Sequence, residues 1–231
     1  MLQYKVVRIN LISRCLRGLL KLLDIIKSIK VIKVAKMNIF FLDRSPEICA
    51  QQHCDKHVVK MIIEYAQLLS TAHRVIDGSS YIHLTEKNHK IKRWKLDDDR
   101  DQILHLAAHV NHPSNIWTRT STSNYNWLYD MWRHLLKEYT YRYDKIHSNE
   151  RLIFALAKPP NNLKFDKWIE PPRAMDDIYK LEGVVESYRN FYLNSKSRFA
   201  RWTKRDIPDW YIEGMMFMIE PMMHNVLQIN D

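Results

Sequence analysis

The densest group of reactive side chains lies in residues 51–57, which read Gln-Gln-His-Cys-Asp-Lys-His. His53 and His57 are four residues apart, and Glu64 follows seven residues after His57, so on one helix all three share a stripe. Imidazole and carboxylate groups on one stripe can bind a metal ion or transfer protons. A second predicted helix repeats this spacing with three histidines, at His105, His109 and His112. We therefore predict the functional site where these two segments meet.

One interpretation of the histidines is a metal centre that uses His53, His57 and His109 to hold a divalent cation. The order of the residues is not the HExxH of metalloproteases, and Cys54 lies off the stripe. The alternative is that several of the histidines are half-buried hydrogen-bonding residues at helix ends. We favour a protein without a cofactor, with a divalent metal as the alternative.

A second interpretation needs no metal. Glu64 shares a helix face with Lys56, Lys60 and His57 and could act as a general acid or base, because neighbouring charges tune the pKa of a carboxylate. A desolvated Lys56 or Lys60 could attack a carbonyl-like carbon as a neutral amine. The alternative is an ordinary i,i+4 ion pair between Lys60 and Glu64 on a solvated helix face. The sequence leaves both possibilities open.

Two further segments have the composition of nucleic-acid contacts. Residues 111–119 put polar side chains and an arginine at a predicted helix-to-helix junction, which suits a phosphate or a flipped base; a capped turn is the alternative. Residues 188–205 interleave aromatic and basic side chains without an acid, which suits base stacking; a solvated amphipathic helix is the alternative. The predicted contacts to nucleic acid are Arg74, Arg119, Arg198, Arg201 and Lys204.

The net charge of +10 is concentrated at the N-terminus. The chain has 36 basic and 26 acidic residues, of which nine basic residues and one acidic residue lie in residues 1–36. Residues 37–231 therefore hold 27 basic and 25 acidic residues, a net charge of +2. Any binding of phosphate by residues 37–231 must therefore come from local patches.

Residues 1–36 alternate apolar pairs with single cations, which is typical of a basic amphipathic helix. The cations recur too often for a transmembrane segment. Four interpretations compete: a helix docked on the body, a membrane-surface or targeting helix, a nucleic-acid arm, and translated sequence upstream of the authentic start. We favour the last, because Met37 opens a compact apolar segment where the basic bias stops.

For residues 37–231 the sequence predicts an all-α, single-domain helical bundle with one short N-terminal strand. The whole chain has only four glycines, and its abundant Leu, Met, Lys and Glu favour helices. We expect a strand at 39–42, an exposed loop at 78–93, and an aromatic core stripe along the third helix. The expected helices cover 45–75, 97–112, 122–145, 149–157, 181–193 and 210–223. Three sparse cysteines indicate a reducing, intracellular compartment.

Several segments carry a resemblance to known proteins. They are Met-Asn-Ile-Phe-Phe-Leu-Asp at 37–43, Cys-Asp-Lys-His-Val-Val-Lys-Met at 54–61, Glu-Tyr-Ala-Gln-Leu-Leu-Ser-Thr-Ala-His-Arg at 64–74, His-Val-Asn-His-Pro-Ser at 109–114, Asn-Tyr-Asn-Trp-Leu-Tyr at 124–129 and Glu-Tyr-Thr-Tyr-Arg-Tyr at 138–143. The chain resembles, in these segments, a family of conserved but poorly characterised proteins of bacteriophages and large DNA viruses. The resemblance covers most of residues 37–231 and excludes 1–36.

The order of short strand, acid-bearing helix, Asn-His-Pro junction and long helix is similar, more distantly, to the pyrimidine-dimer DNA glycosylases of the endonuclease V type. That resemblance implies a helical enzyme that flips a nucleotide, attacks the sugar with an amine and uses a glutamate, for which Glu64 is the candidate and Glu47 the rival. The family uses the amine of a processed N-terminus with Thr exposed. Here Met37 is followed by Asn38, whose bulk disfavours removal of the methionine, and 36 residues precede Met37. If those 36 residues belong to the protein, the N-terminal amine mechanism fails and a lysine would have to replace that amine.

We therefore predict an enzyme of DNA repair or modification, glycosylase-like or lyase-like, with DNA or a nucleotide as substrate and an intracellular site in the host cytoplasm or at the site of virus replication. The predicted catalytic residues are Glu64, His57, Lys56, His109 and His112. One alternative is a metal-dependent hydrolase or oxygenase. The other is a viral DNA-binding or host-interaction protein without enzymatic activity.

Overall fold

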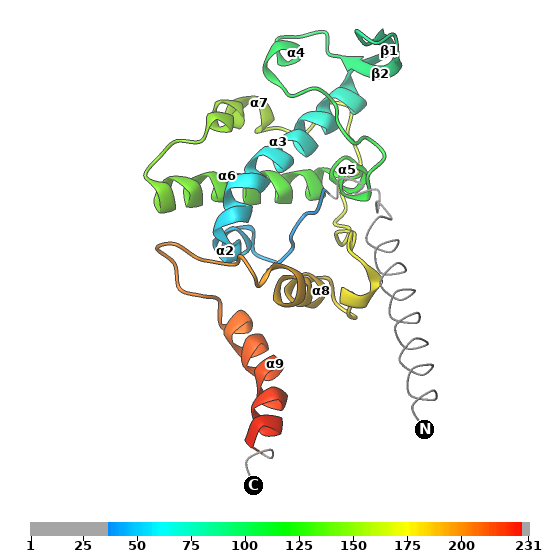
Figure 1. The fold of residues 1–231 in the computed structure, drawn as a ribbon. Coiled ribbons are helices and arrows are strands. Elements are labelled where there is room, and N and C mark those ends of the chain that lie inside the picture. Colours follow the sequence, from blue (N-terminus) through cyan, green and yellow to red (C-terminus); the bar gives the residue numbers. More distant parts are fainter. Residues whose placement is uncertain (1–36, 228–231) are drawn as a thin grey trace, which may run out of the picture. The chain divides into compact units, whose positions relative to one another are not determined.

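Helices make up most of the protein (Figure 1). The structure, a computed structural model, describes residues 37–227, so the interpretations of residues 1–36 lie outside it. The α-helices are α2 (Pro46–Gln52), α3 (Asp55–Asp77), α4 (Arg100–Ile103), α5 (Pro113–Thr118), α6 (Thr122–Tyr143), α7 (Ile153–Leu156), α8 (Val184–Phe191) and α9 (Asp209–Leu227). Strands β1 (Ser79–Leu84) and β2 (Lys90–Lys95), the 3-10 turns Ser148–Leu152 and Asp177–Tyr179, and the π-helical turn Tyr192–Lys196 complete it. The prediction of a mostly helical chain is confirmed.

The core forms where α2 and α3 pack on α6. The aromatic stripe predicted for the third helix is buried there, with Tyr125, Leu128 and Trp132 each fully covered. The indole N–H of Trp132 donates to the carbonyl oxygen of Ile62 at 2.9 Å and so ties α6 to α3. Within residues 37–227, no helix combines the length and the apolar composition that a membrane span requires.

Residues 37–42 are buried but form no strand, so the predicted strand at 39–42 is wrong. The backbone N–H of Phe40 donates to the hydroxyl oxygen of Tyr65 at 3.1 Å, and that of Leu42 contacts the thiol sulfur of Cys49 at 3.3 Å. Side chains of α2 and α3 therefore satisfy backbone groups that a neighbouring strand would otherwise bind.

The helix predicted over 45–75 is divided into α2 and α3. Its start is as predicted, with Ser45 as N-cap and proline in the first turn. The division falls at His53 and Cys54, whose backbones are extended. Buried Arg142 stabilises the break, because its guanidinium donates to the carbonyl oxygens of Gln51 at 2.8 Å and His53 at 2.9 Å. These carbonyls at the end of α2 would otherwise lack partners.

The prediction of a helix over 97–112 is also wrong, since only the short helix α4 forms in this segment. The guanidinium of Arg74 binds the carbonyl oxygens of Asp101, Leu104 and His105 at 2.7, 3.0 and 2.7 Å. A continuing α-helix would need these oxygens for its own N–H groups four residues later. A side chain that lies 27 to 31 residues away in the sequence thus competes with the helix.

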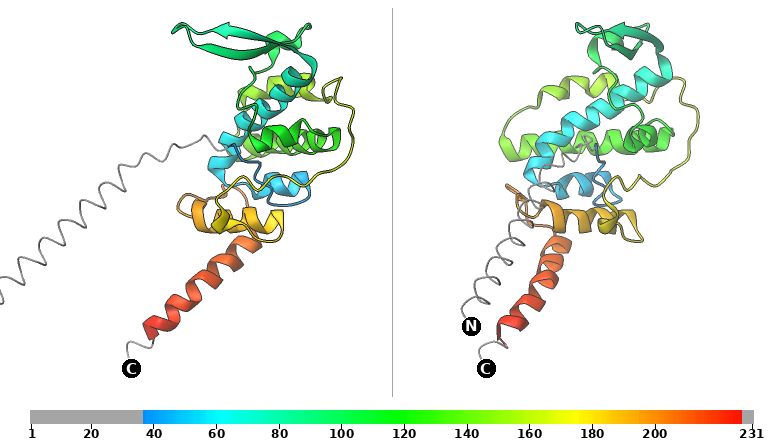
Figure 2. Two further views of the ribbon diagram at one scale, coloured as in Figure 1. Left: turned by 90° about the vertical axis from the view of Figure 1, so that its right-hand side faces the viewer. Right: turned by 45° about the vertical axis from the view of Figure 1, so that its right-hand side comes forward.

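The loop predicted over 78–93 is instead largely an antiparallel hairpin. Strand β1 pairs with β2 from Ser79 opposite Lys95 to Leu84 opposite Lys90. Figure 2 shows the hairpin as a ribbon beyond the C-terminal end of α3. Every residue of β1 is exposed, so this strand lacks the alternation of buried and exposed residues by which a half-buried strand is usually recognised.

The later elements match their predictions apart from their bounds. Helix α6 covers most of the expected 122–145, and the segment 149–157 forms a 3-10 turn followed by α7. The expected helix at 181–193 is α8 followed by a π-helical turn, and the expected C-terminal helix is α9.

Candidate active site

The first half of α3 carries the predicted site, and the residues around it come from distant parts of the chain. His53 is completely buried at the break before α3. Its Nδ1–H donates to the carbonyl oxygen of Cys49 at 2.7 Å, so Nε2 accepts the hydroxyl proton of Tyr65 at 3.2 Å. Burial lowers the pKa of His53 to about 4. Both ring nitrogens are thus engaged in a neutral, structural hydrogen-bond network.

His57 lies in the first turn of α3 and is 5% exposed. Its Nδ1 is hydrogen-bonded to the hydroxyl of Tyr192, and its ring stacks on Phe40 with centroids 4.2 Å apart. Burial lowers the pKa of His57 well below 6.5, and the positive charges of Lys196 and Lys60 add to that effect. The imidazole is therefore neutral at physiological pH and lies in an aromatic setting close to cations.

Glu64 follows two turns later on α3. Its Oε1 is 2.8 Å from the amine Nζ of Lys60, and its side chain is only 16% exposed, against 61% for Lys60. Lys60 therefore forms the expected i,i+4 ion pair, but neither Lys60 nor Lys56 is desolvated as the nucleophile interpretation required. The second oxygen of Glu64, Oε2, is buried and has no hydrogen-bond partner among the described residues. Buried carboxylate oxygens are normally hydrogen-bonded, so an unpartnered one indicates a place for a water molecule, a proton or a ligand group.

Basic side chains and aromatic rings lie beside the first turn of α3, about two turns before Glu64. The amine of Lys56 is 4.9 Å from the centroid of the Phe199 ring, and the Arg198 guanidinium is 5.9 Å from it. The ring of Phe199 is itself 5.7 Å from that of His57. Such an arrangement can neutralise phosphate while offering a ring face to a base.

Tyr192, Phe199 and Phe40 were not among the predicted site residues. Tyr192 and His57 are 135 residues apart, so no local spacing connects them. The available signal was the interleaving of aromatic and basic residues over 188–205, which we interpreted as a nucleic-acid patch. The structure adds that this segment packs against the first turns of α3.

The three later histidines do not form a stripe, because the helix expected to carry them is absent. His105 is half-buried, and burial lowers its pKa. His109 is exposed and has a left-handed backbone with φ 49°. His112 is the N-cap of α5, and its Nδ1 accepts the N–H of Ser114 at 3.2 Å. The predicted catalytic roles of His109 and His112 thus lose the helical geometry on which they were based.

The predicted metal ligands His53, His57 and His109 are not brought to one point. Among residues 37–227, no three His, Cys, Asp or Glu side chains lie close enough together to hold a metal ion.

The five predicted nucleic-acid contacts differ in their surroundings. Arg74 is 2% exposed and donates to protein oxygens through its Nε and both terminal nitrogens, so no donor is left for a phosphate. Arg119 is half-buried and donates to Oδ1 of Asn115 at 3.2 Å, and burial lowers its pKa. Lys204 contacts Oδ2 of Asp144 at 2.6 Å. Arg198 and Arg201 are exposed.

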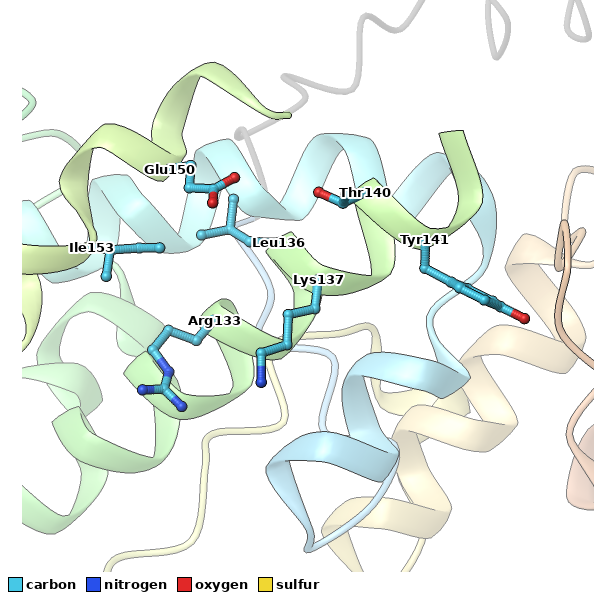
Figure 3. A pocket seen from close by; sticks show the side chains of 7 residues that line it. All are labelled: Arg133, Leu136, Lys137, Thr140, Tyr141, Glu150 and Ile153. Atoms are coloured by element: carbon cyan, nitrogen blue, oxygen red, sulfur yellow. The ribbon is translucent and has the colours of Figure 1, made fainter. Parts of the chain in front are cut away.

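The described surface also has hollows. One groove has a volume of about 590 Å³. Figure 3 shows Arg133 and Lys137 of α6 across from Glu150 and Ile153 in this groove. None of the predicted site residues lines it. A second hollow, of about 620 Å³, is lined by exposed Arg201 together with Trp202 and Tyr211.

Comparisons with protein-family models, curated proteins and solved structures found no match for this chain. Inferences about function therefore depend on the geometry and chemistry of the residues described above.

Proposed function

We propose that the chain is a DNA-directed enzyme of the glycosylase or lyase type, in which Glu64 and Lys60 form the reactive pair. The observation that carries this proposal is the Glu64 carboxylate, which has one oxygen 2.8 Å from the Lys60 amine and the other buried without a partner among the described residues. A carboxylate that is covered on one side and joined to an amine on the other can move a proton between that amine and a substrate.

The proposed reaction begins with transfer of a proton from the Lys60 ammonium to Glu64, which leaves a neutral amine. The amine nitrogen forms a bond to C1′ of a deoxyribose, and the C1′–N bond to the base breaks with its electron pair. The departing base takes the proton from Glu64. When the sugar ring opens, a proton moves from the nitrogen to O4′ and an imine links Lys60 to the sugar.

Residues at the first turn of α3, about one turn before Lys60, support this proposal. Neutral His57 and the ring of Phe199 lie beside the cations Lys56 and Arg198, a combination that suits an unstacked base with its phosphates. Arg198 and Arg201 are the phosphate contacts of the proposal. Burial of the free thiols of Cys49 and Cys54 is compatible with the reducing, intracellular compartment that we propose.

The proposal predicts that the protein is trapped on an oligonucleotide with an abasic site when borohydride reduces the imine. Lys60→Arg should abolish trapping, because guanidinium is not nucleophilic, and Glu64→Gln should slow it by about 100-fold or more. Lys145→Arg is the matched control, since it makes the same exchange at an exposed lysine that the proposal does not use, and it should be trapped like the parent. Equal trapping of the Lys60→Arg variant and the parent would contradict the proposal, as would the absence of trapping in the parent.

A further inference from the structure

The hairpin β1–β2 is unusual in what it exposes. All six residues of β1 are exposed, including Ile82 at 61% and Leu84 at 55%. A two-stranded hairpin in water gains little stability by itself, so exposed apolar residues on one suggest contact with a partner. Residues 79–95 also hold five cations against a single acid, Glu86, a net charge of +4. The cations are Lys87, Lys90, Lys92, Arg93 and Lys95.

The base of the hairpin is fixed to α3. The guanidinium of Arg74 donates to the carbonyl oxygen of Trp94 at 3.1 Å and to the side chain of Asp101, whose Oδ1 accepts the N–H of Leu96 at 2.9 Å. A Cβ on Gly78, between α3 and β1, would lie 2.5 Å from the carbonyl oxygen of Arg74 and 2.7 Å from that of Lys95. This close backbone approach and the buried arginine hold the ribbon at a defined angle to the helix.

Both faces of the ribbon are basic. Residues directly opposite in an antiparallel pair share a face, so Lys90 and Lys92 lie with Leu84 and Ile82 on one face. Arg93 lies opposite Tyr81 on the other face. On the first face the Lys92 amine is 5.2 Å from the centroid of the Trp94 ring. Cations therefore project to both sides, with apolar and aromatic groups between them.

We propose that this hairpin binds duplex DNA, with the ribbon in the major groove and its two cationic faces toward the two phosphate backbones. The major groove, about 12 Å wide, admits a two-stranded ribbon. Six residues per strand give a ribbon of roughly 20 Å, which covers about six base pairs.

The same charge could draw the hairpin to an anionic membrane, but its arrangement favours a groove. A membrane surface meets one face of a ribbon, whereas cations occur here on both faces. The apolar side chains are also interspersed with cations instead of forming one apolar face, which interfacial binding requires.

The test is fluorescence anisotropy of a labelled 20-base-pair duplex with the full-length protein. In one variant Lys87, Lys90 and Lys92 are replaced by Gln. In the control Lys145, Lys158 and Lys167, also exposed, are replaced by Gln, so both variants lose the same charge and keep residues 1–36. We expect the dissociation constant of the hairpin variant to rise about tenfold or more and that of the control to change less than twofold.

Two further measurements make the result specific. Hydrogen exchange of backbone amides in residues 79–95 should slow when the duplex is added to the parent. Vesicles with anionic lipid test the membrane alternative. Equal loss of DNA binding by the two variants would overturn the inference. So would loss of vesicle binding by the hairpin variant while its DNA binding remains intact.

The inference does not depend on the chemistry proposed at Glu64. Protein that is never trapped by borohydride but binds DNA through the hairpin would refute the enzymatic proposal and leave the inference standing. In the opposite case, the hairpin variant is still trapped on a short single strand and binds the duplex as tightly as the parent does. That result would refute the inference about the hairpin and leave the enzymatic proposal standing.

Discussion

At the scale of single residues, the buried histidines are the side chains whose charge state most affects stability. Beside His53 and His57, the structure buries His73, whose Nδ1 accepts an N–H of Arg100 at 2.8 Å. Nε2 therefore carries the proton and donates to the hydroxyl oxygen of Tyr125 at 2.8 Å. Burial, together with the charge of Arg100, lowers the pKa of His73 to about 4.

This pKa predicts that acid destabilises the fold. Between pH 6.5 and about 4 the unfolded chain binds a proton at His73 that the folded chain does not bind, so the stability is complete above pH 6.5 and is lost as pH falls. Each such histidine contributes a slope of up to about 1.4 kcal/mol per pH unit. Urea unfolding of the parent at pH 7, 6 and 5 should show this loss, and His73→Gln should flatten it.

The matched control is His89→Gln, which alters an exposed histidine and should keep the slope of the parent. If His73→Gln shows the parent's slope between pH 7 and 5, His73 is not neutral in the folded protein.

The spacing of His57, Lys60 and Glu64 on one helix could be predicted from the sequence, since i,i+3 and i,i+4 neighbours follow from helix geometry alone. The environment of these residues could not. His57 meets Tyr192 across 135 residues and stacks on Phe40 from a segment that we expected to be a strand. Such interactions depend on tertiary packing, which the local sequence does not specify.

At the scale of elements, the junction of α3 with the hairpin explains the two largest differences between expectation and structure. Residues 78–93 were predicted to be a loop because they are polar and lack a clear period, and in the structure every residue of β1 is exposed. The helix predicted over 97–112 does not extend beyond α4, because Arg74 binds carbonyl groups that the longer helix would need. In contrast, α6 was predictable because its apolar residues recur with the helical period.

This junction predicts the effect of Gly78→Ala. The new Cβ would meet two backbone carbonyl oxygens at 2.5 and 2.7 Å, and backbone atoms cannot move aside cheaply. We expect the free energy of unfolding to fall by about 2 kcal/mol or more, as measured by urea denaturation.

The control is Gly183→Ala, where the Cβ would meet only the flexible side chain of Glu186. It should cost about 1 kcal/mol or less, as expected for alanine at a helix N-cap. Equal losses for the two variants would show that the close approach at Gly78 is not maintained in solution.

At the scale of the whole molecule, charge is unevenly distributed. Residues 37–231 have a net charge of only +2, yet the hairpin alone contributes +4. The concentration of charge in residues 1–36 and the near neutrality of the rest are properties of the sequence. The projection of cations from both faces of one ribbon required the structure, because it depends on the pairing of β1 with β2.

This distribution predicts the salt dependence of DNA binding. Removing one cation that neutralises a phosphate should reduce the slope of log K against log salt concentration by about 0.9. Lys92→Gln should therefore lower the magnitude of the slope by about one, and Lys145→Gln should leave it unchanged. Titrations of the duplex at several salt concentrations measure both slopes, and identical slopes for the two variants would contradict an interaction of Lys92 with phosphate.

The central claim is that Lys60, beside Glu64, is the nucleophile, and the most direct measurement is the identity of the lysine that becomes attached to DNA. The full-length protein is reduced with borohydride on an abasic-site oligonucleotide and digested, and the modified peptide is sequenced by mass spectrometry. We predict that the deoxyribose remnant is attached to Lys60. Attachment at Lys56, at any other amine or at none would contradict the claim.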